Sequence, residues 1–162
     1  MIRLAAIATL VLTTGPTVAA RASDCDHAKV DGEPLVAFEV RGDAVPEPLG
    51  GCTGDPDRGR AVVVDRRSGN CLICHQFPMP DQPFQGEIGP PMAGVGARLS
   101  EGQIRLRLID QSRLNPATLM PPYYRVDGLT NVAPEYRGRP ALDAQSLEDV
   151  VAYLSTLTGE AP

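Results

Sequence analysis

Apolar positions recur at spacings of three and four near the C-terminus of the chain, at Leu147, Val150, Val151, Leu154 and Leu157. This period places the side chains on one face of an α-helix. Asp143 precedes the run and is the expected N-cap, because its carboxylate can accept hydrogen bonds from the free amides of the first turn. The pattern therefore predicts an amphipathic helix near the end of the chain.

A second helix is predicted where Asp55 stands before Pro56, since an N-cap followed by proline at the first helical position is a typical helix start. This helix is expected to run towards Arg67 and to stop near Gly69. Val63 and Val64, the last two of three consecutive valines, lower its helical propensity, so packing in the folded protein has to support it.

A third helix is expected to begin at Ser100, where Gln103 lies three residues further on and completes a capping box. Its apolar residues again give it one apolar side: Ile104, Leu108 and Ile109. The helix is expected to continue to about Arg113 and to end before Asn115-Pro116.

Proline and glycine fill the segments between these helices. Residues 75–97 contain five prolines and four glycines, which excludes a helix or a central strand and is typical of a long functional loop. Residues 23–54 predict an irregular N-terminal arm, in which only residues 34–40 resemble a short strand. The expected fold is all-α, a small domain of few helices separated by long loops.

The first 22 residues have the pattern of a cleaved secretory signal peptide. Arg3 supplies a positive charge, residues 4–12 form an apolar run, and small residues lead to cleavage after Ala22 or Ala20. The apolar run is too short to span a bilayer, so a retained anchor is the weaker alternative. We therefore expect a soluble protein exported to the periplasm, an oxidising compartment in which disulfides form.

Composition narrows the possible partners. The net charge of −5 argues against nucleic acid and anionic membranes and favours a positively charged partner face. Aromatic residues make up 4% of the chain, so a large buried ligand would help to fill a modest core. Three parts are expected: the signal peptide over 1–22, the arm over 23–54 and a single domain over 55–162.

Two of the four cysteines and one of the two histidines lie together in Cys71-Leu72-Ile73-Cys74-His75. This spacing is that of c-type haem attachment, in which two thiols on one turn form thioethers to a porphyrin. The adjacent imidazole then binds the iron as proximal ligand. A zinc site would need a second ligand pair, which Cys25, His27 and Cys52 do not provide at the required spacing. A redox dithiol would need a βαβ context, which is absent from the pattern.

The chain here resembles a class I cytochrome c domain over residues 55–158. More narrowly, it resembles the SoxX family, the monohaem subunits of SoxAX cytochromes in bacterial thiosulfate oxidation. The resemblance rests on four stretches: GNCLICHQ, GEIGPPMAGVGARLSEGQIR, LMPPYYRVDGL and LDAQSLEDVVAYLSTL. It implies one covalent haem c in a class I cytochrome c-like fold.

Met120 is the expected second axial ligand. Met79 follows His75 too closely to reach the other face of the haem, and His27 is interpreted as a surface residue of the arm. Met120 lies far enough along the chain to wrap to the distal face, and the two prolines after it would stiffen its loop. By the resemblance, Met92 packs against the haem instead.

The resemblance also assigns roles to residues around these ligands. The carbonyl of Pro90 is expected to accept the Nδ1–H of His75, which orients the imidazole. Gly59 is expected to allow a close crossing of the first and last helices. Three residues after the Met-Pro-Pro stretch could bond to a haem propionate, face a partner or lie at the surface: Tyr123, Tyr124 and Arg125.

Cys25 and Cys52 are the cysteines left after haem attachment. In an oxidising compartment they are expected to form a disulfide that ties the arm to the domain. Free thiols, or a link to another chain, are the alternatives.

The resemblance implies an electron-transfer subunit without a catalytic residue of its own. SoxX forms a heterodimer with the cytochrome SoxA, and the complex, an L-cysteine S-thiosulfotransferase, joins thiosulfate to a cysteine of the carrier protein SoxYZ. The bond-forming chemistry is expected on SoxA, while this chain passes electrons to a soluble acceptor. Two alternatives remain open: a free-standing class I cytochrome c that feeds a terminal oxidase, and a haem sensor or peroxidase-like enzyme with an open axial site.

The loop over residues 76–96 is the expected interface with this partner. Its many apolar and proline side chains exceed what one haem face is expected to cover, and exposed apolar patches commonly mark interfaces. The alternative is that the loop wraps its own haem and arm.

Overall fold

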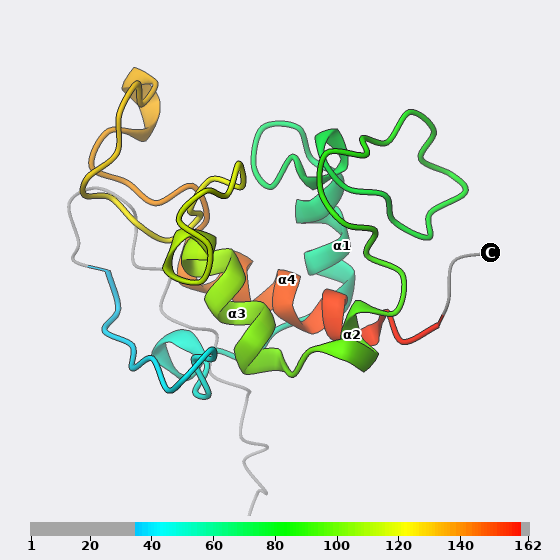
Figure 1. Cartoon of the computed structure of the whole chain (residues 1–162), viewed down its shortest axis with the longest axis horizontal. Coiled ribbons are helices and arrows are strands. Elements are labelled where there is room, and N and C mark those ends of the chain that lie inside the picture. The colour runs from blue at the N-terminus through cyan, green and yellow to red at the C-terminus, as the bar shows by residue number, and fades with distance from the viewer. Residues whose placement is uncertain (1–34, 160–162) are drawn as a thin grey trace, which may run out of the picture.

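The computed structural model describes residues 35–159 (Figure 1). Its helices are α1 (Pro56–Val64), α2 (Val95–Arg98), α3 (Glu101–Asp110) and α4 (Ala144–Thr156). Within these residues there is no β-strand, only an isolated bridge between Arg41 and Ala44. The expected all-α fold is confirmed. No helix in this part of the chain is long and apolar enough to cross a membrane.

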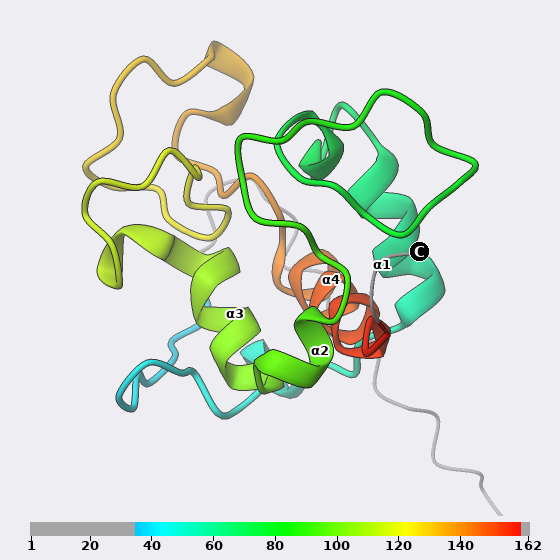
Figure 2. The ribbon, with the colours of Figure 1, turned by 45° about the vertical axis from the view of Figure 1, so that its right-hand side comes forward.

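The amphipathic helix α4 lies at the centre of the domain. Its apolar face is buried, as the periodicity predicts, through Leu147, Val150, Val151 and Leu154. Helix α1 crosses α4, and α3 packs on another side of it (Figures 1 and 2). The two neighbouring helices add Val63, Leu106 and Ile109 to the same core. This helical layer carries the long loops on one side.

Gly59 allows the close crossing of α1 and α4. A Cβ atom at this position would collide with the backbone carbonyl of Asp149 and with the Cβ of Tyr153, so only glycine fits. The close crossing expected at Gly59 is therefore confirmed. Gly54, just before α1, meets the carbonyl of Glu148 in the same way.

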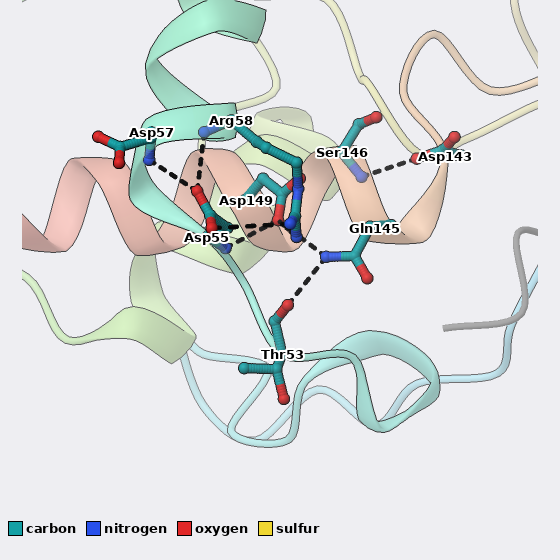
Figure 3. Close-up of polar contacts among 8 residues, drawn as sticks. All are labelled: Thr53, Asp55, Asp57, Arg58, Asp143, Gln145, Ser146 and Asp149. Atoms are coloured by element: carbon teal, nitrogen blue, oxygen red, sulfur yellow. Dashed lines mark hydrogen bonds and ion pairs between the residues drawn. The ribbon is translucent and has the colours of Figure 1, made fainter. Parts of the chain in front are cut away.

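A buried carboxylate fixes the start of α1 on α4 (Figure 3). The side chain of Asp149 is 4% exposed and accepts two hydrogen bonds from the guanidinium of Arg58, at 2.7 and 2.8 Å. It also accepts from the amide of Asp55 and from the side chain of Gln145, each at 2.8 Å. A bidentate arginine contact of this kind is geometrically specific. Helix α4 therefore sets the direction in which the chain enters α1.

The described part of the N-terminal arm belongs to the domain core. Val45 and Leu49 are each 1% exposed. Beside them Arg105 and Glu148 form a buried ion pair at 2.7 Å. Arg105 also donates to the carbonyl of Val45, and Glu148 accepts from the amide of Leu49. Because these bonds compensate two buried charges, the arm, α3 and α4 form one unit.

The strand expected over residues 34–40 was wrong for the described part of that stretch. Residues 35–40 are irregular, because no neighbouring strand pairs with them. The amide of Val36 donates instead to the hydroxyl of Tyr124, at 3.1 Å. Strand propensity depends on such context and does not supply a pairing partner.

The predicted helix starts are all present. Asp55, Ser100 and Asp143 are N-caps, and the side chain of each accepts a hydrogen bond from a backbone amide of the first turn. The capping box of Ser100 with Gln103 is complete, since the amide of Ser100 donates to the Gln103 side chain at 2.9 Å. These contacts are local in sequence, which is why the pattern predicts them.

The helix ends agree less well. Helix α1 stops at Val64, earlier than expected, because the carboxylate of Asp65 accepts from the amide of Arg67 and the hydroxyl of Ser68 and closes a turn. Helix α3 passes into a 3-10 turn, Gln111–Arg113, so the third helical segment ends where expected. The short helix α2 was not predicted, because its first three residues belong to the stretch 75–97, for which a helix was excluded; that expectation was wrong at the end of the stretch.

Candidate haem site

The Cys-x-x-Cys-His motif forms a single tight turn. Cys71–Ile73 is a 3-10 helix, entered through Asn70 in a left-handed conformation with φ 48°. The amides of Cys74 and His75 both donate to the carbonyl of Cys71, at 3.2 and 3.0 Å. The two half-buried thiols are free. Both cysteines therefore belong to one turn, with the histidine directly after it.

Burial raises the pKa of the free thiol of Cys71 to about 12. Within residues 35–159, no group of three His, Cys, Asp or Glu side chains is placed to hold a metal ion.

The imidazole of His75 is held by the loop that follows it. Its Nδ1 lies 2.8 Å from the carbonyl oxygen of Pro90. A carbonyl only accepts, so Nδ1 carries the proton and Nε2 keeps a free lone pair. Gly89 lies against the ring, and a Cβ atom there would collide with the imidazole. The contact expected between Pro90 and His75 is present, whereas the role of Gly89 was missed.

The proline- and glycine-rich loop wraps round the motif by backbone hydrogen bonds. They run from Gly86 to Leu72, from Gly89 to Cys74 and from Met92 to Gln76, at 2.8, 2.7 and 2.8 Å. Gly86 also approaches the carbonyl of Ile73 so closely that a side chain would not fit. Both glycines belong to the sequence pattern GxxGPP. This pattern could have indicated their roles, because a position at which another part of the chain comes close to the backbone requires glycine.

The segment that carries Met120 lies on the same side of the helical layer as the motif. In Figures 1 and 2 this yellow segment and the green loop after the motif both lie above α3 and α4. Met120 is half-buried against the core, and its amide donates to the hydroxyl of Thr118 at 3.1 Å. The chain is then anchored on α3, since the amide of Tyr123 donates to the carbonyl of Leu108 at 3.1 Å.

The other methionines take different positions. Met79 is 5% exposed and belongs to the protein core, which agrees with its rejection as a ligand. Met92 is half-buried and packs against the same core. Its amide donates a hydrogen bond to the carbonyl of Gln76, the residue that follows the motif. Its expected contact with the haem stays a prediction.

The three residues with open roles are now placed. The hydroxyl of Tyr123 donates to the carbonyl of Gly69 at 2.8 Å, next to the motif. Tyr124 is 4% exposed and accepts from Val36, so it faces neither solvent nor a partner. Arg125 donates to the carboxylate of Asp110 at 2.8 Å.

Asp110 joins the end of α3 to the segment after Met120. Burial by itself raises the pKa of its carboxyl, but hydrogen bonds from Ser112 and the charge of Arg125 outweigh this effect and lower the pKa. The carboxylate is therefore ionised in the folded protein at neutral pH.

Cys25 and His27 lie outside the described residues. Cys52 is 3% exposed. No disulfide joins two cysteines within residues 35–159. The pairing of Cys25 with Cys52 stays a prediction.

The residues present fit a covalently bound haem. Cys71 and Cys74 supply two free thiols on one turn, and His75 directs Nδ1 to the carbonyl of Pro90, which leaves Nε2 for a metal. A methionine, Met120, lies on the neighbouring segment and is half-buried against the core. A histidine and a methionine beside a thiol pair form the donor set of a cytochrome c.

Comparison with known proteins supports this interpretation. No protein-family model matches the chain, and no curated protein matches it in sequence. Its fold matches a chain of the crystal structure of SoxXA from P. pantotrophus, with a TM-score of 0.69 and 36% sequence identity. The match covers 75% of this chain and 94% of the other. The chain therefore belongs to the family of SoxX-like cytochromes.

Proposed function

We propose that this chain is a periplasmic electron-transfer subunit with one haem attached through Cys71 and Cys74. It works beside a SoxA-like cytochrome in the oxidation of thiosulfate. The observation that carries the proposal is the oriented imidazole of His75 beside two free thiols, in a chain similar to a SoxXA subunit. When bound, the haem supplies a one-electron couple at its iron.

The residues around the site set the properties of that couple. His75 binds the iron through Nε2, and the carbonyl of Pro90 increases the basicity of the ring by accepting its Nδ1–H. Met120 would supply the second ligand of the iron. A thioether favours ferrous iron, so this ligand pair would raise the reduction potential. With both residues bound, the site would favour electron transfer over activation of a bound substrate.

Sulfur chemistry is assigned to other proteins of the pathway. Within residues 35–159 the free thiols are those of the haem motif, and haem attachment consumes both. The joining of thiosulfate to a cysteine of SoxYZ therefore takes place on the SoxA-like partner, and this chain passes the electrons to a soluble acceptor.

An exposed apolar surface beside the motif fits the partner. Ile73 lies within the motif and is 62% exposed. In the following loop Ile88 is 68% exposed, and Phe84 is 97% exposed and held at φ 64°. Large apolar side chains in such exposed positions mark interaction surfaces. We assign this surface, defined as Ile73, Phe84 and Ile88, to contact with the SoxA-like cytochrome.

Purification from the native periplasm tests the proposal. The mature protein is expected to elute together with a second haem polypeptide in constant ratio, even at high salt. Elution as a single chain would favour a free electron carrier. Tight binding of carbon monoxide by the native reduced protein would indicate an open axial site and contradict the proposed ligand pair.

A further inference from the structure

Two tyrosine hydroxyls reach the turn that precedes the haem motif. Tyr123 donates to the carbonyl of Gly69 and Tyr136 donates to the carbonyl of Arg67, each at 2.8 Å. Both tyrosines follow Met120 in the sequence, and both acceptors lie in the turn between α1 and Cys71. These bonds join segments that are 54 and 69 residues apart.

Tyr123 is the more rigidly placed of the two. Its amide donates to the carbonyl of Leu108 at 3.1 Å, and its carbonyl accepts from the amide of Leu142 at 3.0 Å. Tyr136, by contrast, lies in the short turn Pro134–Tyr136, and its hydrogen bond is exposed.

The chain around Met120 has few other backbone anchors. Pro121 and Pro122 follow Met120 directly and have no amide hydrogen to donate. The amide of Met120 itself reaches only the neighbouring hydroxyl of Thr118. The first long-range anchor after the methionine is therefore Tyr123, through its backbone towards α3 and through its hydroxyl towards Gly69.

We propose that Tyr123 is a positioning residue that ties the segment of the second axial ligand to the turn of the haem motif. Its hydroxyl holds the two segments at a fixed separation, so that the sulfur of Met120 stays on the iron. This inference rests on the proposed function, in which Met120 is that ligand. Tyr136 strengthens the same turn at the surface without this effect on the ligand.

Loss of the Tyr123 hydroxyl is expected to weaken the bond between the sulfur of Met120 and the iron. The net contribution of one hydrogen bond corresponds to a factor of roughly 2 to 13 in an equilibrium constant. In the ferric holoprotein, Tyr123→Phe should therefore increase the apparent affinity for imidazole, which has to displace the methionine, by this factor. The phenyl ring keeps the apolar packing, so the fall in the thermal unfolding midpoint should be limited to the few degrees that one hydrogen bond supplies.

The experiment compares mature wild-type, Tyr123→Phe and Tyr136→Phe holoproteins. Imidazole titration is followed by the near-infrared band that reports a thioether bound to ferric haem. Tyr136→Phe is the matched control, because it removes the same type of bond to the same turn. The inference predicts a higher imidazole affinity for Tyr123→Phe and a wild-type affinity for Tyr136→Phe.

Four results would overturn the inference. Equal affinities for Tyr123→Phe and the wild type, or an equal rise in both variants, would remove any special role of Tyr123. Loss of holoprotein in Tyr123→Phe alone would make the hydroxyl a folding determinant instead. Absence of the thioether band from the wild type would refute the proposed ligand itself, and with it both proposals.

Discussion

At the scale of single residues, the imidazole of His75 is oriented by the protein chain alone. The carbonyl of Pro90 determines which ring nitrogen carries the proton, and Gly89 brings the backbone flat against the ring. Nε2 is thereby left as the nitrogen for the iron. Met120 is the ligand that we propose for the other side of the iron, whereas Met79 is buried in the protein core.

Met120→Ala is expected to abolish the near-infrared thioether-to-ferric band and to lower the reduction potential, because the ligand that favours ferrous iron is removed. The absorption spectrum and a redox titration of the purified holoprotein measure both effects. Met92→Ala is the control and should keep the band. A band that survives in Met120→Ala and disappears in Met92→Ala would reverse the assignment.

Part of the arrangement around His75 could be predicted from the sequence. Five adjacent residues are enough to recognise the Cys-x-x-Cys-His pattern, because its spacing is local, and the contact of Pro90 with His75 followed from the family resemblance. The contact of Tyr123 with Gly69 joins residues 54 positions apart, and no local pattern indicates it. Gly89 was missed although the GxxGPP stretch contains it, because its neighbour is the side chain of His75.

At the scale of elements, the helix starts follow from local capping, but the crossing of α1 with α4 also depends on tertiary contacts. Asp55, Ser100 and Asp143 bond within their own first turns, so each was predicted. The end of α1 depends on the turn closed by Asp65, and no strand forms over 35–40 because no partner strand is available. Tertiary contacts determine where α1 ends and whether residues 35–40 form a strand, and the pattern of a single sequence does not show these contacts directly.

Gly59→Ala is expected to lower the free energy of unfolding by about 2 kcal/mol or more, because the added methyl group collides with the backbone of α4. Chemical denaturation of the holoprotein measures the change. Gly159→Ala is the control, since nothing lies within 4 Å of a Cβ atom there. A Gly59→Ala protein as stable as this control would contradict the close crossing.

Asp110 predicts a dependence of stability on pH. Its pKa is lowered in the folded state, so the unfolded chain binds more protons at acidic pH, and the stabilisation is present above the ordinary carboxyl pKa of about 4. It is lost as the pH falls through the lower folded-state pKa. Asp110→Asn should therefore reduce stability by about 1–3 kcal/mol at pH 7, and by progressively less below pH 4. Denaturation curves of both proteins between pH 7 and 3 measure this, and a pH-independent difference would contradict it.

At the scale of the whole molecule, one side of the helical layer carries the haem motif, the loop that wraps it and the segment of Met120. The exposed surface of Ile73, Phe84 and Ile88 lies on that motif and loop. If the proposed ligands fill both axial positions of the haem, electrons would enter and leave through its edge, and a partner at this surface would lie next to the attachment motif. The described part of the N-terminal arm packs elsewhere, on α3 and α4.

Phe84→Ser is expected to weaken the complex with the partner haem polypeptide roughly thirtyfold, the effect of losing an aromatic anchor worth about 2 kcal/mol. The haem spectrum should not change, because the side chain is 97% exposed. Val40→Ser, which alters an exposed apolar residue of the arm, is the control. The dissociation constant is measured with the partner purified from the native periplasm. An unchanged value for Phe84→Ser would show that Phe84 does not belong to the interface.

The intact mass of the mature protein tests the central claim most directly. The protein is exported in a host that matures c-type cytochromes, unfolded, and extracted with acid and acetone to remove haem that is not covalently bound. Its intact mass is then measured by mass spectrometry. We predict the mass of the chain without its signal peptide plus one haem, and loss of that haem when Cys71 and Cys74 are both replaced by serine. A mass equal to that of the polypeptide alone would contradict the account.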